Sequence, residues 1–170
     1  MSSVDVSQLN ILIVEDNVHF RTLIRSILHA LGMTSLSEAQ DGVEALEILA
    51  EKSPDLVILD WKMEGMDGVE CVTQIRAISG ANRFVPIIMV TGYTETSLMN
   101  QAREAGVNGF LGKPISPQSL LNRIVGVLEN PAPFYETNDF FGPDRRSADH
   151  KIEGADKRVA QCDPVKPPTD

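Results

Sequence analysis

The chain has 170 residues, of which 42% are hydrophobic and 23% charged, and its formal net charge is −9. This composition is typical of a globular protein, and the acidic balance argues against a dominant surface for nucleic acid or for an anionic membrane. No apolar run approaches the ~18 residues of a membrane helix, and Met1–Asn10 lacks the basic start and apolar stretch of a signal peptide. We therefore expect a cytoplasmic protein without membrane insertion.

Short apolar runs alternate with segments of helical periodicity as far as residue 130. The apolar residues of Val18–Leu31 repeat at helical spacing, whereas the stripe of Leu98, Ala102 and Ala105 is weaker. Five strand-then-helix units joined by short links predict an α/β fold, a doubly wound parallel sheet with helices on both faces. The predicted elements, in chain order, are strand Asn10–Val14, helix Val18–Leu31, strand Met33–Ala39, helix Gly42–Glu51, strand Asp55–Asp60, helix Gly68–Ser79, strand Phe84–Thr91, helix Thr96–Ala105, strand Val107–Gly112 and helix Pro117–Glu129.

The composition changes after Asn130, where prolines and mixed charges replace the apolar periodicity. We predict an N-terminal extension over residues 1–8, one folded domain over residues 9–130 and a proline-rich tail over residues 131–170 that is extended or partly disordered. The tail contains aromatic residues at Phe134-Tyr135 and at Phe140-Phe141, directly before Arg145-Arg146.

Five polar positions follow the apolar runs at the point where each predicted strand ends. They are Glu15-Asp16, Asp60, Thr91 and Lys113. Because the carboxyl ends of parallel strands meet at one edge of a sheet, we expect these side chains to converge there. An Asp after a strand is often only a helix cap, but the shared strand end of all five positions favours a site.

Three carboxylates held close together repel one another unless a cation neutralises them. Oxygen ligands in a small pocket suit Mg²⁺. A carboxylate beside Mg²⁺ can attack a phosphoryl group and form an aspartyl phosphate. Thr91 can donate a hydrogen bond to one phosphoryl oxygen and Lys113 can neutralise another. The Lys113-Pro114 bond is also suited to a cis peptide, which would turn the lysine inward.

Four motifs resemble the receiver domain of two-component response regulators, and most closely the stand-alone CheY-like regulators. The resemblance covers Leu9–Glu129 and implies the flavodoxin-like strand order 2-1-3-4-5, which the residues alone do not establish. The motifs are ILIVEDN at Ile11–Asn17, LVILDWKMEGMDG at Leu56–Gly68, PIIMVTGY at Pro86–Tyr93 and GFLGKPI at Gly109–Ile115.

The resemblance assigns roles to individual residues. It makes Asp60 the phosphoacceptor, and Thr91 and Lys113 the residues that respond to phosphorylation. Phe110 matches the aromatic position that turns inward when the threonine moves, although it lacks the hydroxyl of the more common tyrosine. The implied Mg²⁺ ligands are Asp16, Asp60 and the backbone carbonyl of Lys62, with Glu15 acting through water.

We therefore expect a single-domain response regulator, a phosphorylation switch and not an enzyme with a substrate of its own. The expected partners are a sensor histidine kinase or histidine phosphotransfer protein and a downstream protein target. One alternative is a constitutive pseudo-receiver adaptor, against which the intact acidic set argues. Another is a phosphatase that uses an aspartyl phosphate, but such enzymes typically carry a second acid where this chain has Lys62.

The tail leaves three interpretations open. Phe140, Phe141, Arg145 and Arg146 could belong to an inert extension. They could dock on the receiver's own surface, on a second copy in a homodimer or on a partner. They could instead form an arginine clamp for a phosphate ligand such as a cyclic dinucleotide. Of these, our specific prediction is that Phe134–Arg146 docks on the receiver or on a second copy.

Overall fold

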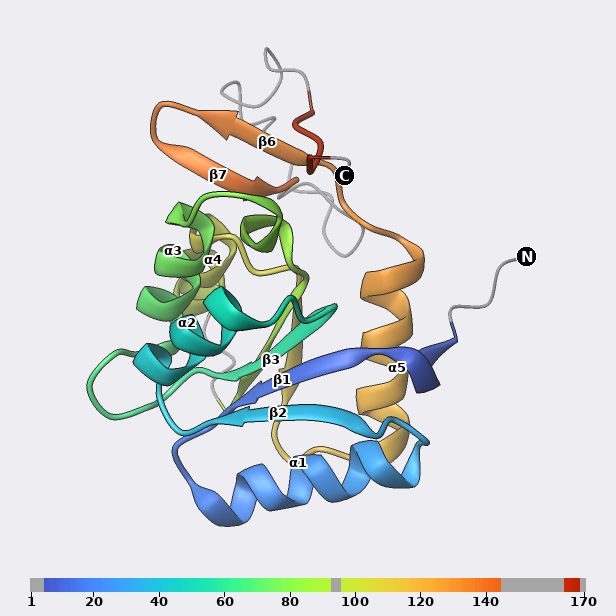
Figure 1. The fold of residues 1–170 in the computed structure, drawn as a ribbon. Coiled ribbons are helices and arrows are strands. Elements are labelled where there is room, and N and C mark those ends of the chain that lie inside the picture. The colour runs from blue at the N-terminus through green and yellow to red at the C-terminus, as the bar shows by residue number, and fades with distance from the viewer. Residues whose placement is uncertain (1–4, 93–95, 145–163, 169–170) are drawn as a thin grey trace.

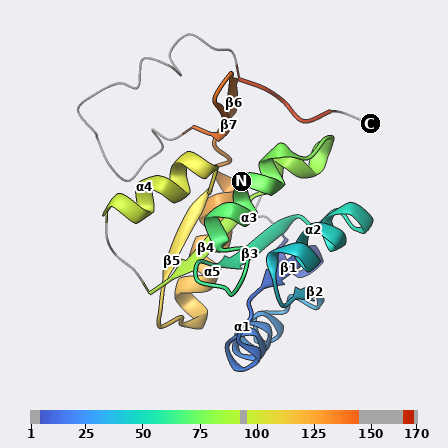
Figure 2. The same cartoon turned by 90° about the vertical axis from the view of Figure 1, so that its left-hand side faces the viewer.

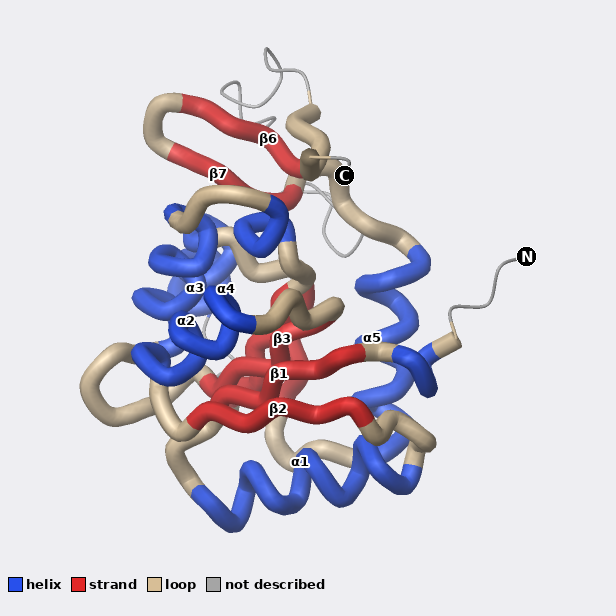
Figure 3. Tube along the Cα trace, viewed as in Figure 1, coloured by secondary structure: helices blue, strands red, loops and turns tan. Residues whose placement is uncertain are grey.

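The computed structural model describes residues 5–92, 96–144 and 164–168. Its centre is a five-stranded parallel sheet in the order β2-β1-β3-β4-β5. Figures 1 and 3 show β2, β1 and β3 side by side, and Figure 2 labels all five strands. The predicted fold class and the strand order implied by the resemblance are both confirmed. The strands are β1 (Asn10–Val14), β2 (Ser35–Ala39), β3 (Leu56–Asp60), β4 (Ile87–Thr91) and β5 (Gly109–Gly112).

Helices cover both faces of the sheet. Helices α1 and α5 lie on one face, and α2, α3 and α4 lie on the other (Figures 1 and 2). Successive side chains of a strand point to opposite faces of the sheet, so alternate residues contribute to the two layers of the core. Leu12 and Val14 pack under α2 and α3, whereas Ile11 and Ile13 pack under α1. The helices are α1 (Val18–Ala30), α2 (Gly42–Glu51), α3 (Gly68–Ala77), α4 (Thr96–Ala105) and α5 (Pro117–Glu129).

Side-chain caps start four of these helices directly after the turns that leave the strands. The side chain of Asn17 accepts hydrogen bonds from the first-turn amides of α1, and those of Asp41 and Asp67 do the same for α2 and α3. Ser116 forms a capping box with Ser119, and Pro117 occupies the first turn of α5. These caps fix the starts of α1, α2, α3 and α5 near the edge of the sheet where the strands end.

Six boundaries differ from the sequence prediction. Helix α1 ends at Ala30 instead of Leu31, and strand β3 begins at Leu56 instead of Asp55. Strand β2 begins at Ser35 instead of Met33, and α3 ends at Ala77 instead of Ser79. Strand β4 begins at Ile87, because Ala81–Phe84 forms a 3-10 turn, η2. Strand β5 begins at Gly109, because the backbone N–H of Val107 still donates to the carbonyl of Ala102 and so closes the end of α4.

The structure contains a hairpin in the tail, where the sequence predicted no regular element. Strands β6 (Phe134–Thr137) and β7 (Phe140–Pro143) pair antiparallel across the two-residue turn Asn138-Asp139. The backbone N–H of Val165 donates to Phe134 on the other edge of β6. A short 3-10 turn, η1 (Val6–Gln8), precedes β1.

None of the helices in the described ranges is long and apolar enough to cross a membrane.

Candidate functional site

Three acidic side chains meet at the carboxyl edge of the sheet. Asp60 is the last residue of β3, and Glu15 and Asp16 follow directly after β1, the neighbouring strand. One carboxylate oxygen from each lies within 4.8 Å of the others. Glu15 and Asp60 are almost fully buried, with 1% and 4% of their surface exposed, whereas Asp16 is exposed. The structure thus brings together the three acids that were predicted to converge because each follows or ends a strand.

Lys113 enters the same cluster from the end of β5. Its Nζ lies 2.8 Å from Oδ1 of Asp60 and 3.8 Å from Oε2 of Glu15. The Lys113-Pro114 peptide is cis. The Nζ also lies 4.1 Å from the centre of the Phe20 ring on α1. The ammonium group is therefore held between two acids and an aromatic face.

Burial sets the electrostatics of this cluster. The pKa of Glu15 is raised to about 7, chiefly because burial removes contact with water and also because Asp60 is negatively charged. The N–H of Asn17 and the charge of Lys113 oppose this rise. Burial also raises the pKa of Asp60, and the hydrogen bond and charge of Lys113 oppose that rise. One ammonium shared by three acids leaves an excess of negative charge, and a cation would relieve it.

The residues present fit a Mg²⁺ ion. Oε2 of Glu15 is buried without a hydrogen-bond partner, which leaves one oxygen in the cluster available for a cation. Oδ2 of Asp16 accepts a hydrogen bond of 3.0 Å from the backbone N–H of Glu64, so the loop after β3 orients this carboxylate. A set of carboxylate oxygens suits Mg²⁺ better than a transition metal. The backbone N–H of Lys62 donates to Asp60, and metal ligation by its carbonyl remains a prediction.

Thr91 lies on β4, the strand next to that of Asp60, and Phe110 lies on β5, one strand further out. Thr91 is the last residue of β4 and is 5% exposed, and its carbonyl accepts a hydrogen bond of 2.9 Å from the backbone N–H of Lys113. Phe110 is half-buried on β5. The Arg103 guanidinium, on the last turn of α4, lies 5.4 Å from the centre of the Phe110 ring. Of the two residues that the resemblance links in a switch, Thr91 therefore lies next to the acidic site and Phe110 lies next to α4.

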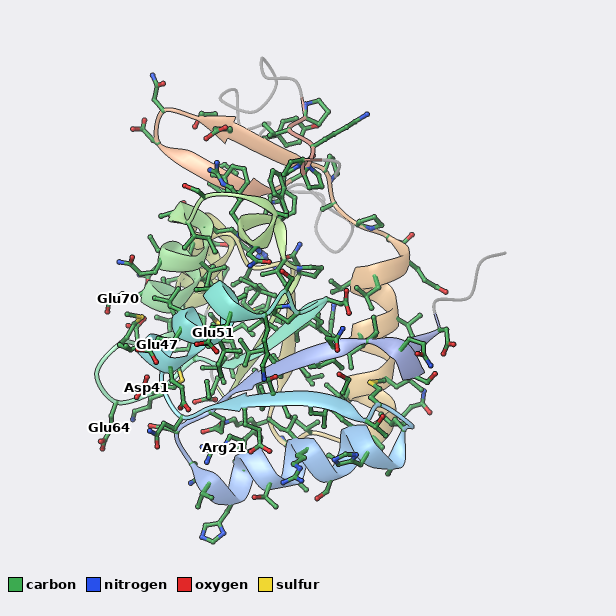
Figure 4. The ribbon with its side chains drawn as sticks, viewed as in Figure 1. Arg21, Asp41, Glu47, Glu51, Glu64 and Glu70 are labelled. Atoms are coloured by element: carbon green, nitrogen blue, oxygen red, sulfur yellow. The ribbon has the colours of Figure 1, made fainter. Side chains whose placement is uncertain are left out.

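Sequence reasoning missed three residues that shape the site. Arg21 on α1 donates a hydrogen bond of 2.6 Å to the carbonyl of Glu15 and pairs with Glu38 at 3.2 Å; Figure 4 shows it reaching from α1 toward β2. Phe20 underlies the lysine. Gly68 allows α3 to start against β3, because a Cβ there would lie 2.5 Å from the carbonyl oxygen of Asp60. Of these three residues, only Gly68 could have been noticed in the sequence, since it follows the helix-capping residue Asp67.

The tail residues lie away from this site. Phe141 packs against Phe84 of η2, with ring centres 5.1 Å apart, and Phe140 lies half-buried at the start of β7. Arg145 and Arg146 lie outside the described residues, and so does the proposed clamp for a phosphate ligand.

Comparison with known proteins agrees with this geometry. Residues 11–125 match the response regulator receiver domain family. The chemotaxis protein CheY of Pseudomonas aeruginosa is 36% identical over 121 residues, which cover 71% of this chain and 97% of that protein. CheY-3 of Vibrio cholerae is 32% identical over 129 residues, which cover 76% of this chain and 98% of that protein.

Two solved structures have the same fold. A putative response regulator from Chloroflexus aurantiacus superposes with a TM-score of 0.67 at 30% identity, covering 72% of this chain and 98% of that one. The receiver domain of the sensor histidine kinase PA1611 from Pseudomonas aeruginosa PAO1 has magnesium ion coordinated in its active site cleft. It superposes with a TM-score of 0.62 at 30% identity, covering 69% of this chain and 93% of that one. The acidic edge, the fold and these matches together show that the chain belongs to the response regulator receiver domain family.

Proposed function

We propose that the chain is a single-domain response regulator in a two-component phosphorelay, in which Mg²⁺-dependent phosphorylation of Asp60 switches binding to a protein partner. The observation that carries the proposal is the position of Asp60, a buried carboxylate flanked by two acids and 2.8 Å from an ammonium group. In this interpretation residues 9–130 form the receiver, and residues 131–170 are an appendage that includes the β6–β7 hairpin.

The phosphoryl transfer is a displacement at phosphorus. A carboxylate oxygen of Asp60 forms a bond to phosphorus while the bond to the donor breaks, so the donor leaves with the bonding electron pair. Asp16, Asp60 and the Lys62 carbonyl would hold Mg²⁺, with Glu15 acting through water, and the ion would supply positive charge for the acids and the phosphoryl oxygens. Lys113 already contacts one Asp60 oxygen and can neutralise a second phosphoryl oxygen as charge builds up.

The switch then runs from Thr91 to the surface beside β5. A hydrogen bond from Thr91 to the phosphoryl group would draw this residue toward Asp60 and open space for Phe110 to turn inward. That movement would reshape the surface formed by α4, β5 and α5, where we place the downstream protein target. A stabilisation of a few kcal/mol by the phosphoryl group is needed to shift the population substantially.

The phosphoryl donor is proposed by the chemistry of the acceptor. A carboxylate forms an energy-rich acyl phosphate, so its donor must itself be energy-rich, as the phosphohistidine of a sensor histidine kinase or a histidine phosphotransfer protein is. The similarity to the receiver domain of a sensor histidine kinase supports this class of donor.

A mass measurement tests the proposal. The chain is incubated with acetyl phosphate and Mg²⁺, and we expect the intact mass to rise by one phosphoryl group. Asp60→Asn should gain none, whereas the matched control Asp139→Asn, an exposed acid in the hairpin turn, should behave as the wild type. Equal gain of mass by Asp60→Asn at the wild-type rate would show that another group is the acceptor.

A further inference from the structure

The β6–β7 hairpin lies outside the segment that matches the receiver family, which ends at residue 125. It sits at the end of the sheet away from Asp60, because its contacts are with η2, which enters β4, and with the loop that enters β5 (Figures 1 and 2). The hairpin is therefore an addition to the receiver, placed at the edge opposite the acidic site.

An aromatic cluster anchors one face of the hairpin. The ring centres of Phe134, Phe141 and Phe84 lie 5.1 to 5.4 Å apart in pairs. The Arg83 guanidinium lies 3.5 Å from the centre of the Phe141 ring and pairs with Glu136 at 3.2 Å. Strand alternation and the pairing of Glu136 with Phe141 put Phe134, Glu136 and Phe141 on the same face. This face holds the hairpin on η2.

The hairpin also packs against the end of α4. Gly106 follows α4 with a positive φ of 111°, and a Cβ on Gly142 of β7 would lie only 3.0 Å from the Cα of Gly106. Buried Arg76 of α3 donates to the Gly106 carbonyl through Nε at 3.1 Å and Nη2 at 2.8 Å. The Phe134 ring covers this arginine, with its centre 5.0 Å from the guanidinium carbon. The hairpin, Arg76 and the last residues of α4 thus form one packed unit.

Helix α4 connects this unit to the switch residues. The helix follows β4, which ends at Thr91, and spans about 15 Å before it reaches Gly106. Its last turn carries Arg103, whose guanidinium lies over the half-buried ring of Phe110. A continuous series of contacts therefore runs from Gly142 through Gly106 and Arg103 to Phe110.

We propose that the hairpin is an intramolecular clamp that holds the C-terminal end of α4 and thereby opposes the inward turn of Phe110. The proposal rests on the function proposed above, since it names a regulator of that switch. In the structure the hairpin contacts the end of α4 while Phe110 is half-buried beside Arg103, so docking stabilises this arrangement. Coupling is reciprocal, and therefore phosphorylation of Asp60 should loosen the hairpin as much as the hairpin opposes phosphorylation.

Two variants release the clamp by different means. Phe141→Ala removes the ring that contacts Phe84 and Arg83, and Gly142→Val adds a side chain against Gly106 while it keeps all three aromatic rings. Tyr135→Ala is the matched control, because it also removes an aromatic ring from the hairpin, but one outside the aromatic cluster and without a cation–π contact among the described residues. Urea denaturation first establishes that each variant keeps a cooperative fold.

Hydrogen exchange then measures the hold on α4. The amides of Gly106 and Val107 donate to carbonyls of the last turn of α4 and report whether that turn opens. In both clamp variants these amides should exchange on the order of tenfold faster than in the wild type, and in Tyr135→Ala at the wild-type rate. Unchanged exchange at Gly106 and Val107 in both clamp variants would overturn the clamp.

Affinity for a phosphoryl mimic measures the coupling. Beryllium fluoride with Mg²⁺ binds reversibly, and the fluorescence of Trp61, next to Asp60, can follow it. Both clamp variants should bind roughly fivefold tighter than the wild type or more, and Tyr135→Ala should not. Wild-type affinity in both clamp variants would refute the regulatory role. If acetyl phosphate leaves wild-type Asp60 unmodified, the proposed function itself is wrong. The regulatory role of the clamp is then also refuted, because the switch that it regulates does not exist.

Discussion

The burial of Glu15 predicts that this carboxyl group destabilises the metal-free receiver as pH rises. Its pKa is raised from 4.5 to about 7 by burial, so between these values the folded protein keeps a proton that the unfolded chain has released. The free energy of unfolding therefore falls as pH rises through this window. At roughly 1.4 kcal/mol for each pH unit, the full loss above pH 7 amounts to about 3 kcal/mol.

Glu15→Gln removes this titration while a carboxamide oxygen can still accept the N–H of Asn17. In EDTA, we expect the variant to match the wild type near pH 4.5 and to exceed its free energy of unfolding by about 3 kcal/mol above pH 7. Urea denaturation followed by the fluorescence of Trp61 measures both proteins across the window. Glu47→Gln, which changes an exposed glutamate of α2 (Figure 4), is the control and should run parallel to the wild type.

Added Mg²⁺ should reduce or reverse the difference in free energy of unfolding between Glu15→Gln and the wild type. The wild type should gain stability as the ion binds, and Glu15→Gln should gain less because it has lost one of the three acids. If wild type and Glu15→Gln showed the same pH dependence in EDTA, the burial argument for this carboxylate would be refuted. Equal stabilisation of the two proteins by Mg²⁺ would remove Glu15 from the metal site.

Three further predictions concern the switch, the metal and the fold. Thr91→Ala should accept a phosphoryl group at Asp60 yet fail to change partner binding, and full partner response in this variant would disprove the coupling. Mg²⁺ in the millimolar range should change the fluorescence of Trp61, whereas a flat titration with an intact fold would count against the site. Gly68→Ala should lower the free energy of unfolding by about 1–3 kcal/mol, because its Cβ would lie 2.5 Å from the Asp60 carbonyl oxygen. Gly126→Ala, whose Cβ meets open space in α5, should instead raise it by about 0.5–1 kcal/mol, and a similar effect at both glycines would refute the packing argument.

Element order and type could be predicted largely because the apolar runs of the three central strands are buried on both faces of the sheet. Strands β1, β3 and β4 are almost wholly buried, and the helices show apolar repeats at helical spacing. Even the weak stripe of the predicted fourth helix was confirmed, with α4 at Thr96–Ala105. Two of the misplaced strand starts have local causes that the apolar pattern does not encode. Phe84 was predicted to begin a strand but belongs to a 3-10 turn, and Val107 was predicted to begin a strand but closes the end of α4 with a hydrogen bond.

The candidate site was predictable as a set of residues because parallel topology forces strand ends together. Once the sheet is parallel, Glu15, Asp16, Asp60 and Lys113 must lie at one edge. Their environment was not predictable. Three features depend on how α1 and the end of β5 pack at this edge of the sheet. They are the buried Oε2 of Glu15 without a hydrogen-bond partner, the ring of Phe20 beside Lys113 and the hydrogen bond from Arg21 to the Glu15 carbonyl.

The tail marks the limit of the sequence. Aromatic residues on either side of Asn138-Asp139 carried a hairpin signal, and prolines at positions 131, 133 and 143 obscured it. What the hairpin contacts could not be derived, because Phe84 on a turn and Gly106 after a helix carry no mark of a distant partner. By itself the sequence determined a parallel α/β fold with an acidic edge, since buried apolar strands and their polar ends are local patterns, whereas the strand order came from the resemblance to receiver domains. Only the tertiary structure placed the hairpin on the end of α4, because that contact joins segments whose patterns are independent of each other.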